Sequence, residues 1–184
     1  MKKNQDPIKS VSEIIKLINN QQFNIAEKEL IKVIKIKKEN YYPYYLLGNI
    51  YALQKKFSEA LDQLKLSYKL NSNDKTLCYN LAVVYDELNE LKNSQNMFEK
   101  SLEIDPEYIN ANLGLAKNFE QQKNFDKAKF FFEKTIKLNK DFKLANQMYG
   151  KFLIRIGEIN KGQYYNYKYS GVLRFSQGEI KIIS

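Results

Sequence analysis

The fold of this 184-residue chain is decided by the stretch YYPYYLLGNIYALQKKFSEALDQLKLSYKLNSND, residues 41–74. In its second half, Leu61, Leu64 and Tyr68 follow one another at spacings of three and four, which is typical of a helix with one apolar side. The polar run at residues 71–74 consists of turn and capping residue types. We therefore predict two helices, residues 41–54 and 57–70, that are followed by a turn.

The same pattern returns every 34 residues, in rows that begin at residues 7, 41, 75, 109 and 143. One column of this alignment is small in every row, and another is always large and apolar. A small residue in the second helix allows its backbone to approach the first helix, while large residues fill the space between pairs. The small column is Ala26, Ala60, Ser94, Ala128 and Gly162, and the large column is Phe23, Phe57, Leu91, Phe125 and Ile159.

The period predicts an all-α chain that forms one array of five antiparallel helix pairs. We place the repeats at residues 7–40, 41–74, 75–108, 109–142 and 143–170, followed by a tail at 171–184. The predicted helices are 8–20 with 23–38, 41–54 with 57–70, 75–88 with 91–104, 109–122 with 125–138, and 143–156 with 159–170.

The two terminal rows depart from the pattern. The first row is polar at Ser10 and Glu13, which suits a cap that faces solvent. The last row contains tyrosines at 164, 165, 167 and 169, which we interpret as a lid over the core in preference to a partner-binding face. The tail alternates apolar and polar residues, which indicates either a short hairpin or an extended strand. Because such a hairpin is marginal alone, we expect it to dock on the last repeat or to attach the chain to something else.

Residue composition excludes several kinds of site. The chain has no histidine and one cysteine, so an intrachain disulfide, a Cys/His zinc site and a His-based catalytic triad or dyad are all excluded. We predict no cofactor, no metal and no catalytic residue, and we interpret Cys78 as a buried, inert thiol. The residues from Met1 to Ser10 lack the apolar core of a signal peptide, and no stretch has the length of a membrane span, so we expect a soluble cytoplasmic protein.

The net charge of +9 invites a nucleic-acid hypothesis, but the charges are unevenly placed. Residues 75–108 carry 3 basic and 7 acidic groups, so the middle of the chain is acidic. A surface that follows phosphates needs a continuous basic stripe, and this acidic row interrupts it. Nucleic-acid binding is therefore the weaker hypothesis.

These residues resemble the tetratricopeptide repeat (TPR) family. Tyr44, Leu47, Gly48 and Tyr51 match its W-x2-L-G-x2-Y pattern, with Tyr in place of Trp. The resemblance extends over about residues 7–170, and it implies a right-handed superhelix of helix pairs. It also implies a non-catalytic adaptor or scaffold that binds a protein or peptide, because the repeat occurs in adaptors of many pathways.

In this family the first helix of each pair lines a concave groove. The resemblance therefore assigns a peptide-binding role to polar and aromatic residues on these helices, since amides pair with peptide backbone and rings supply contact area. The basic members of the set lie late in the chain, so we expect a partner with an acidic segment at one end and an apolar or aromatic segment at the other. The predicted groove residues are Tyr45, Asn49, Tyr79, Asn80, Asn110, Lys117, Lys151 and Arg155.

Of four other functions, two remain as alternatives. The family's clamp for chaperone C-termini needs cations where this chain has Tyr45, Asn110 and Gly114, so we reject that function. A module that presents substrates to a separate enzyme is the main alternative, and a nucleic-acid-binding accessory protein is the lesser one. Intrinsic catalysis has no support, because the Tyr85, Asp86 and Glu87 cluster is explained by the repeat.

Overall fold

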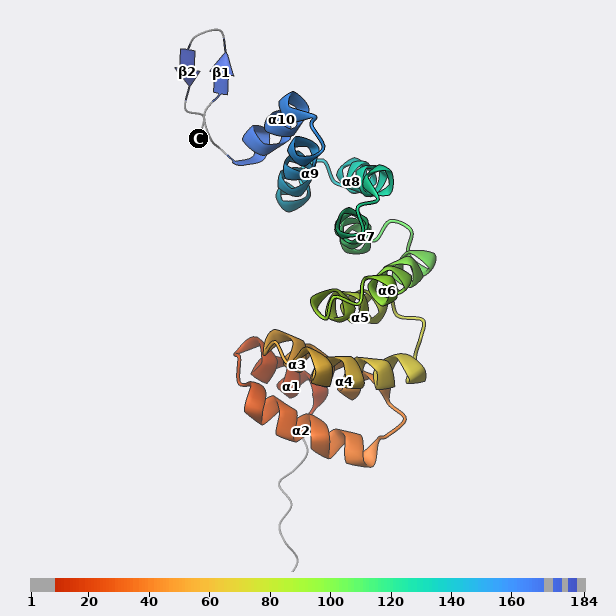
Figure 1. Ribbon diagram of the computed structural model, residues 1–184. Coiled ribbons are helices and arrows are strands. Elements are labelled where there is room, and N and C mark those ends of the chain that lie inside the picture. The colour runs from red at the N-terminus through yellow and green to blue at the C-terminus, as the bar shows by residue number, and fades with distance from the viewer. Residues whose placement is uncertain (1–8, 171–173, 177–178, 182–184) are drawn as a thin grey trace, which may run out of the picture. The chain divides into compact units, whose positions relative to one another are not determined.

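The computed structural model describes residues 9–170, 174–176 and 179–181, with side chains for residues 9–168. These residues form ten helices and one antiparallel hairpin (Figure 1). The helices are α1 (Val11–Asn19), α2 (Phe23–Ile36), α3 (Tyr41–Leu53), α4 (Phe57–Leu70), α5 (Lys75–Glu87), α6 (Leu91–Ile104), α7 (Ile109–Gln121), α8 (Phe125–Leu138), α9 (Lys143–Arg155) and α10 (Ile159–Ser170).

The predicted helix pairs are confirmed, and the helices from α2 onward begin at the predicted residues. The first helix, predicted near residue 8, begins three residues later, at Val11. The physical reason is Ser10, whose hydroxyl accepts a hydrogen bond from the Glu13 backbone N–H while the Glu13 carboxylate accepts one from the Ser10 N–H. This reciprocal capping box makes Ser10 the N-cap, so that the helix begins at the next residue.

The chain divides into two compact units, residues 1–104 and 105–184. Within each unit, the two helices of every pair pack on one another and successive pairs are in contact. The right-handed superhelix and the single array concern the placement of the two units, and they stay predictions.

In the first unit, α1 to α6 enclose two apolar cores. One core lies among α1, α2 and α3, around Ile14, Leu30 and Ile50. The other lies among α3, α4 and α5, around Leu64 and Leu81. Because α3 contributes to both cores, its rings and aliphatic side chains connect the first repeat to the second.

The small column is fully buried where the two helices of a pair meet. Ala26, Ala60, Ser94 and Ala128 are each 0% exposed. In the last pair the column is Gly162, and a Cβ placed there would lie 2.6 Å from the Gly150 carbonyl oxygen. The prediction that this column permits close helix approach is confirmed, and between α9 and α10 the approach leaves no room for a Cβ.

The second unit contains α7 to α10 and has an aromatic core. Phe132 of α8 and the Tyr149 and Phe152 rings of α9 are 0% exposed. Phe132 lies 5.7 Å from Tyr149 and 5.2 Å from Phe152 between ring centroids, distances at which aromatic rings attract one another. Tyr165 of α10 covers this core, with its ring 4.9 Å from Tyr149 and edge to face.

The turn inside each of the five described pairs contains one residue in the left-handed backbone conformation, with a positive φ. These residues are spaced 34 positions apart, like the repeats. Four of the five positions are not glycine, although a positive φ costs L-residues free energy. Each turn begins at the end of the first helix and is closed by backbone hydrogen bonds, as between the Lys56 N–H and the Tyr51 carbonyl at 2.9 Å. The φ values are 58° at Gln21, 61° at Lys55, 59° at Asn89, 60° at Lys123 and 91° at Gly157.

The sequence allows two structures for the tail, a hairpin or an extended strand, and two roles for the tyrosines of the last helix, a lid over the core or a partner-binding face. Strands β1 (Arg174–Ser176) and β2 (Glu179–Lys181) pair antiparallel, so the hairpin is confirmed and the extended strand is wrong. The prediction that its side chains dock on the last repeat falls outside the described side chains. In α10, Tyr165 acts as the lid, whereas Tyr164 and Tyr167 remain 53% and 42% exposed.

Cys78 belongs to a third column of equivalent residues with Asn112 and Asn146. Each of the three side chains is 0% exposed and donates to the carbonyl oxygen six residues earlier in the chain. The thiol lies 3.8 Å from the Ser72 oxygen, a weak version of the amide contacts in the next two repeats. Its burial is therefore confirmed.

We expect Cys78 of the native protein to react slowly with a thiol reagent at neutral pH. Burial raises the pKa of the thiol to about 11, and the thiolate is the reactive form. Labelling should accelerate strongly in denaturing urea, measured by absorbance of the released chromophore. Equal rates in the native and unfolded protein would contradict an inert thiol.

Candidate functional site

The candidate residues of the first unit lie on α3 and α5, which are in contact. Tyr45 and Asn49 are one turn apart on α3, and Asn80 lies on α5. The Asn80 amide nitrogen donates to the Asn49 oxygen at 2.9 Å and to the Tyr45 hydroxyl at 3.2 Å. Three of the predicted residues therefore form one hydrogen-bonded cluster, and all three are partly exposed.

A pocket of about 640 Å³ lies beside this cluster. Asn49, Tyr79 and Asn80 line it, so three of the four predicted residues of this unit reach the same hollow. Tyr79 rests on Phe98, with 5.8 Å between ring centroids, which fixes the side of the ring that faces the pocket. Leu53 also lines the pocket and is 63% exposed, so an apolar surface is offered beside the amides.

The candidate residues of the second unit are more scattered. Lys117 of α7 and Lys151 of α9 are exposed. Arg155 makes an ion pair with Glu120, so its charge is compensated within the unit. Burial raises the pKa of the Glu120 carboxyl, and the nearby Arg155 and Lys117 oppose this shift. Asn110 is exposed elsewhere, in a hollow of about 420 Å³ whose lining includes acidic residues.

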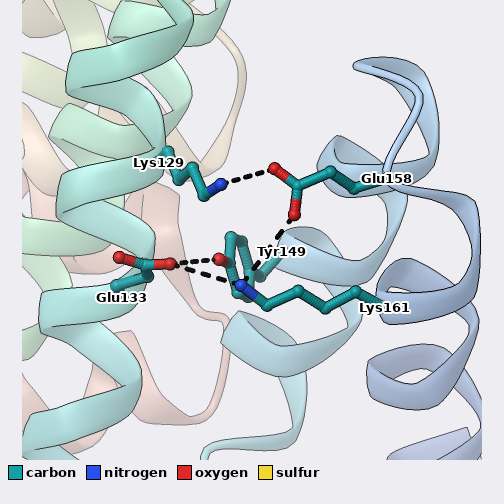
Figure 2. Close-up of polar contacts among 5 residues, drawn as sticks. All are labelled: Lys129, Glu133, Tyr149, Glu158 and Lys161. Atoms are coloured by element: carbon teal, nitrogen blue, oxygen red, sulfur yellow. Dashed lines mark hydrogen bonds and ion pairs between the residues drawn. The ribbon is translucent and has the colours of Figure 1, made fainter.

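A further set of charged residues was missed by sequence reasoning. Figure 2 shows Lys129 and Glu133 of α8 beside Glu158 and Lys161 at the start of α10, with the Tyr149 hydroxyl between the two groups. The Tyr149 hydroxyl donates to the Glu133 carboxylate at 2.6 Å, and the Lys161 nitrogen lies 3.6 Å from the same oxygen. The sequence signal was the spacing of four between Lys129 and Glu133, which puts both on one side of α8.

This set is structural in character. Lys129 and Glu158 form an ion pair, and their contact lowers the pKa of Glu158 and raises that of Lys129. Burial and the Glu133 contact raise the pKa of Tyr149 far above its ordinary value. The hydroxyl therefore stays protonated and holds α8 and α9 together, which gives it no role as an acid or base near neutral pH.

The described residues contain no group of three acidic or thiol side chains that could hold a metal ion. Within the same residues, every helix is too short or too polar to cross a membrane.

Comparison with known proteins identifies the repeat. A model of the tetratricopeptide repeat matches residues 41–74, 76–108 and 109–142, more than half of the chain and in the register that the sequence predicts. The uncharacterised protein ycf37 of Pyropia yezoensis is 30% identical over 112 residues, which is 56% of this chain. The chain spans 63% of that relative's length, and 38% of the length of ycf37 of Porphyra purpurea, which is 35% identical over 66 residues.

Solved structures agree on the fold. A structure of MamA from Desulfovibrio magneticus RS-1, residues 41 to the end, has a TM-score of 0.80 at 16% identity and covers 86% of this chain and 90% of that one. YrrB, described as a TPR protein with an unusual peptide-binding site, has a TM-score of 0.72 at 16% identity and covers 84% of this chain and 80% of that one. Since the family model and the helix pairs agree, the chain belongs to the tetratricopeptide repeat family.

Proposed function

We propose that the chain is a non-catalytic adaptor that holds a segment of a partner protein on α3 and α5. The family is typical of protein–protein interaction scaffolds. The observation that supports this site is the pocket of about 640 Å³, which joins a pair of side-chain amides to exposed apolar surface.

The amides suit a peptide backbone. The bond between the Asn80 nitrogen and the Asn49 oxygen fixes both amide planes and leaves the Asn80 oxygen and the Asn49 nitrogen outside that bond. One of these atoms is an acceptor and the other is a donor, so together they match the N–H and C=O groups of one extended peptide unit. Because the planes are already fixed, binding costs little side-chain entropy.

The apolar wall suits a side chain of the same partner. Leu53, Val83 and the Tyr79 ring supply area that a leucine-sized or aromatic side chain would cover, and such anchors carry most of the free energy of binding. For one pocket and one backbone contact we expect a micromolar dissociation constant, which corresponds to about −8 kcal/mol.

The second unit would contribute charge. Lys117 and Lys151 are exposed, whereas Arg155 is already paired with Glu120. We therefore assign an acidic segment of a partner to Lys117 and Lys151, as a contact of the second unit taken by itself, and we no longer propose Arg155 as a contact. Exposed charges of this kind mainly set orientation and association rate.

The apolar contact is tested by Leu53→Ser. Tyr45→Ala is a poor test, because Tyr45 packs against both apolar cores of its unit and its loss would disturb the fold. Leu53 is 63% exposed, so its replacement should leave the thermal midpoint nearly unchanged. Leu66→Ser on α4 is the matched control, since Leu66 is 45% exposed and lies outside the pocket lining.

We expect a partner captured by the wild-type chain and identified by mass spectrometry to bind the Leu53→Ser chain about tenfold more weakly, through faster dissociation. Leu66→Ser should bind within about twofold of wild type. Surface plasmon resonance measures both rates. If Leu53→Ser and Leu66→Ser dissociate at the same rate, the pocket is not the site.

The charged contact is tested by Lys117→Glu together with Lys151→Glu. This double variant should slow association with the same partner by about three- to tenfold at low salt and much less at high salt. Dissociation should change little, because exposed charges contribute little to residence time. An unchanged association rate would remove the two lysines from the site.

A further inference from the structure

A second hollow lies in the second unit, on side chains that the proposed function does not use. Its volume is about 420 Å³, and its walls come from the last turns of α8, from the loop before α9 and from α10. Lys137, Lys140 and Lys168 contribute to its lining together with Glu133, Tyr164 and Tyr165. Its described lining contains none of the eight predicted groove residues.

The charge of this lysine-tyrosine pocket is positive. Three lysines face one carboxylate, and that carboxylate is already engaged, since Glu133 accepts a hydrogen bond from the Tyr149 hydroxyl and lies 3.6 Å from Lys161. Like charges gathered around one hollow repel one another, and an anion in the hollow relieves that repulsion.

The pocket also offers ring surface. Tyr164 is 53% exposed and meets Tyr165 edge to face at 5.5 Å between centroids. The Lys168 nitrogen lies 5.6 Å from the centre of the Tyr164 ring, so cation and ring occupy the same part of the wall. A ligand that carries both a carboxylate and an apolar or aromatic side chain would use both features.

The surroundings favour a short anionic segment over a long polyanion. Beyond Glu133, positive and negative side chains alternate, because Lys129 and Lys161 are each in contact with Glu158 (Figure 2). A nucleic-acid backbone that left the pocket in this direction would meet the Glu133 and Glu158 carboxylates, which repel phosphates. A few acidic residues confined to the hollow would not reach them.

We propose that the lysine-tyrosine pocket binds a short acidic segment of a protein partner, with carboxylates at Lys137, Lys140 and Lys168 and an apolar or aromatic side chain against Tyr164. This site uses none of the residues proposed on α3 and α5. A negative result at one site would therefore leave the proposal for the other unchanged.

The probe is the blocked peptide Glu-Glu-Tyr-Glu-Glu with a fluorescent label, titrated against the full chain at low salt and followed by anisotropy. The same peptide with Gln in place of Glu tests the need for charge. Lys137→Glu with Lys168→Glu reverses two of the pocket's three lysine charges. Lys35→Glu with Lys92→Glu is the matched control, because both lysines are exposed and belong to neither proposed site. Each double variant lowers the net charge from +9 to +5, so general electrostatic attraction changes equally in both.

We expect the pocket double variant to bind the acidic peptide at least about tenfold more weakly and the Lys35→Glu with Lys92→Glu control within about twofold of wild type. Tyr164→Ala leaves the net charge unchanged and should weaken binding about threefold or more. Circular dichroism and the thermal midpoint establish that each variant is folded.

Three results would overturn the proposal. Equal weakening by both double variants would mean that the peptide responds to net charge alone. Equal binding of the Gln peptide would mean that carboxylates are not recognised. Tighter binding of a single-stranded oligonucleotide, lost in the pocket double variant, would mean that the occupant is a nucleic acid.

Discussion

Tyr149→Ala should destabilise the protein by about 3–5 kcal/mol, the usual cost of removing a large ring from a packed core. Tyr149 is 0% exposed and contacts the Phe132, Phe152 and Tyr165 rings. The substitution would empty the space where α8, α9 and α10 meet. At roughly 2–4 °C per kcal/mol for a chain of this size, the thermal midpoint should fall by on the order of 10 °C.

Tyr149→Phe separates the ring from the hydroxyl. It keeps the packing and removes the hydrogen bond to Glu133, so we expect a loss of only about 1 kcal/mol, since that carboxylate is half-exposed. Tyr167→Ala is the control for an exposed ring in α10 and should cost less than about 0.5 kcal/mol. Calorimetry gives the midpoints, and hydrogen exchange should locate the loss of protection in α8 to α10. Similar midpoints for Tyr149→Ala and Tyr167→Ala would contradict the buried position.

Gly162→Ala should also destabilise the protein, although alanine is the better helix former by about 1 kcal/mol. The added methyl would lie 2.6 Å from the Gly150 carbonyl oxygen and 2.9 Å from the Ile154 backbone nitrogen. Both atoms belong to the α9 backbone, which cannot rotate away, so α9 and α10 must separate. We expect a net loss of about 1–3 kcal/mol, measured by urea denaturation.

Gly48→Ala is the matched comparison, because it makes the same change at another close helix contact. Its methyl would lie 2.6 Å from Leu64 Cγ and 2.8 Å from Leu64 Cδ2, both side-chain atoms, whereas the nearest backbone atom, the Ala60 carbonyl oxygen, is 3.2 Å away. Since Leu64 can shift by a small rotation, Gly48→Ala should cost less than Gly162→Ala. The reverse order would show that backbone contact does not limit the approach of α9 and α10.

The period of the sequence predicted the helix pairs because it reports packing between pairs, which repeats every 34 residues. The small column predicted close approach at Gly162 for the same reason. One apparent failure of the pattern was Asn166, where earlier rows have leucine or phenylalanine. A Cβ at Gly150 would lie 2.6 Å from the Asn166 oxygen, but one at Gly48 would lie 2.6 Å from Leu64 in the same way, so the change from leucine to asparagine has no structural explanation.

The candidate site was predicted only in part. Helix periodicity places Tyr45 and Asn49 on one side of α3, but it does not reveal the bonds from Asn80, which depend on side-chain torsions. The pairing of Arg155 with Glu120 was missed for a related reason. Residues 35 positions apart lie one residue away from the 34-residue register, so column comparison keeps them in separate columns.

The left-handed residue inside each helix pair has a consequence for how such a chain can evolve. Gln21, Lys55, Asn89 and Lys123 each hold a conformation that glycine adopts more easily, and each lies in a different repeat. Changes at sites this far apart are usually additive, so the strain can be relieved one turn at a time. Each step should gain about 1 kcal/mol, because the larger entropy loss of glycine on folding offsets part of the relieved strain. Glycine substitutions at these turns can therefore add stability in small steps. A sequence that acquires a destabilising substitution at a binding residue can compensate for it by substituting glycine at a distant turn.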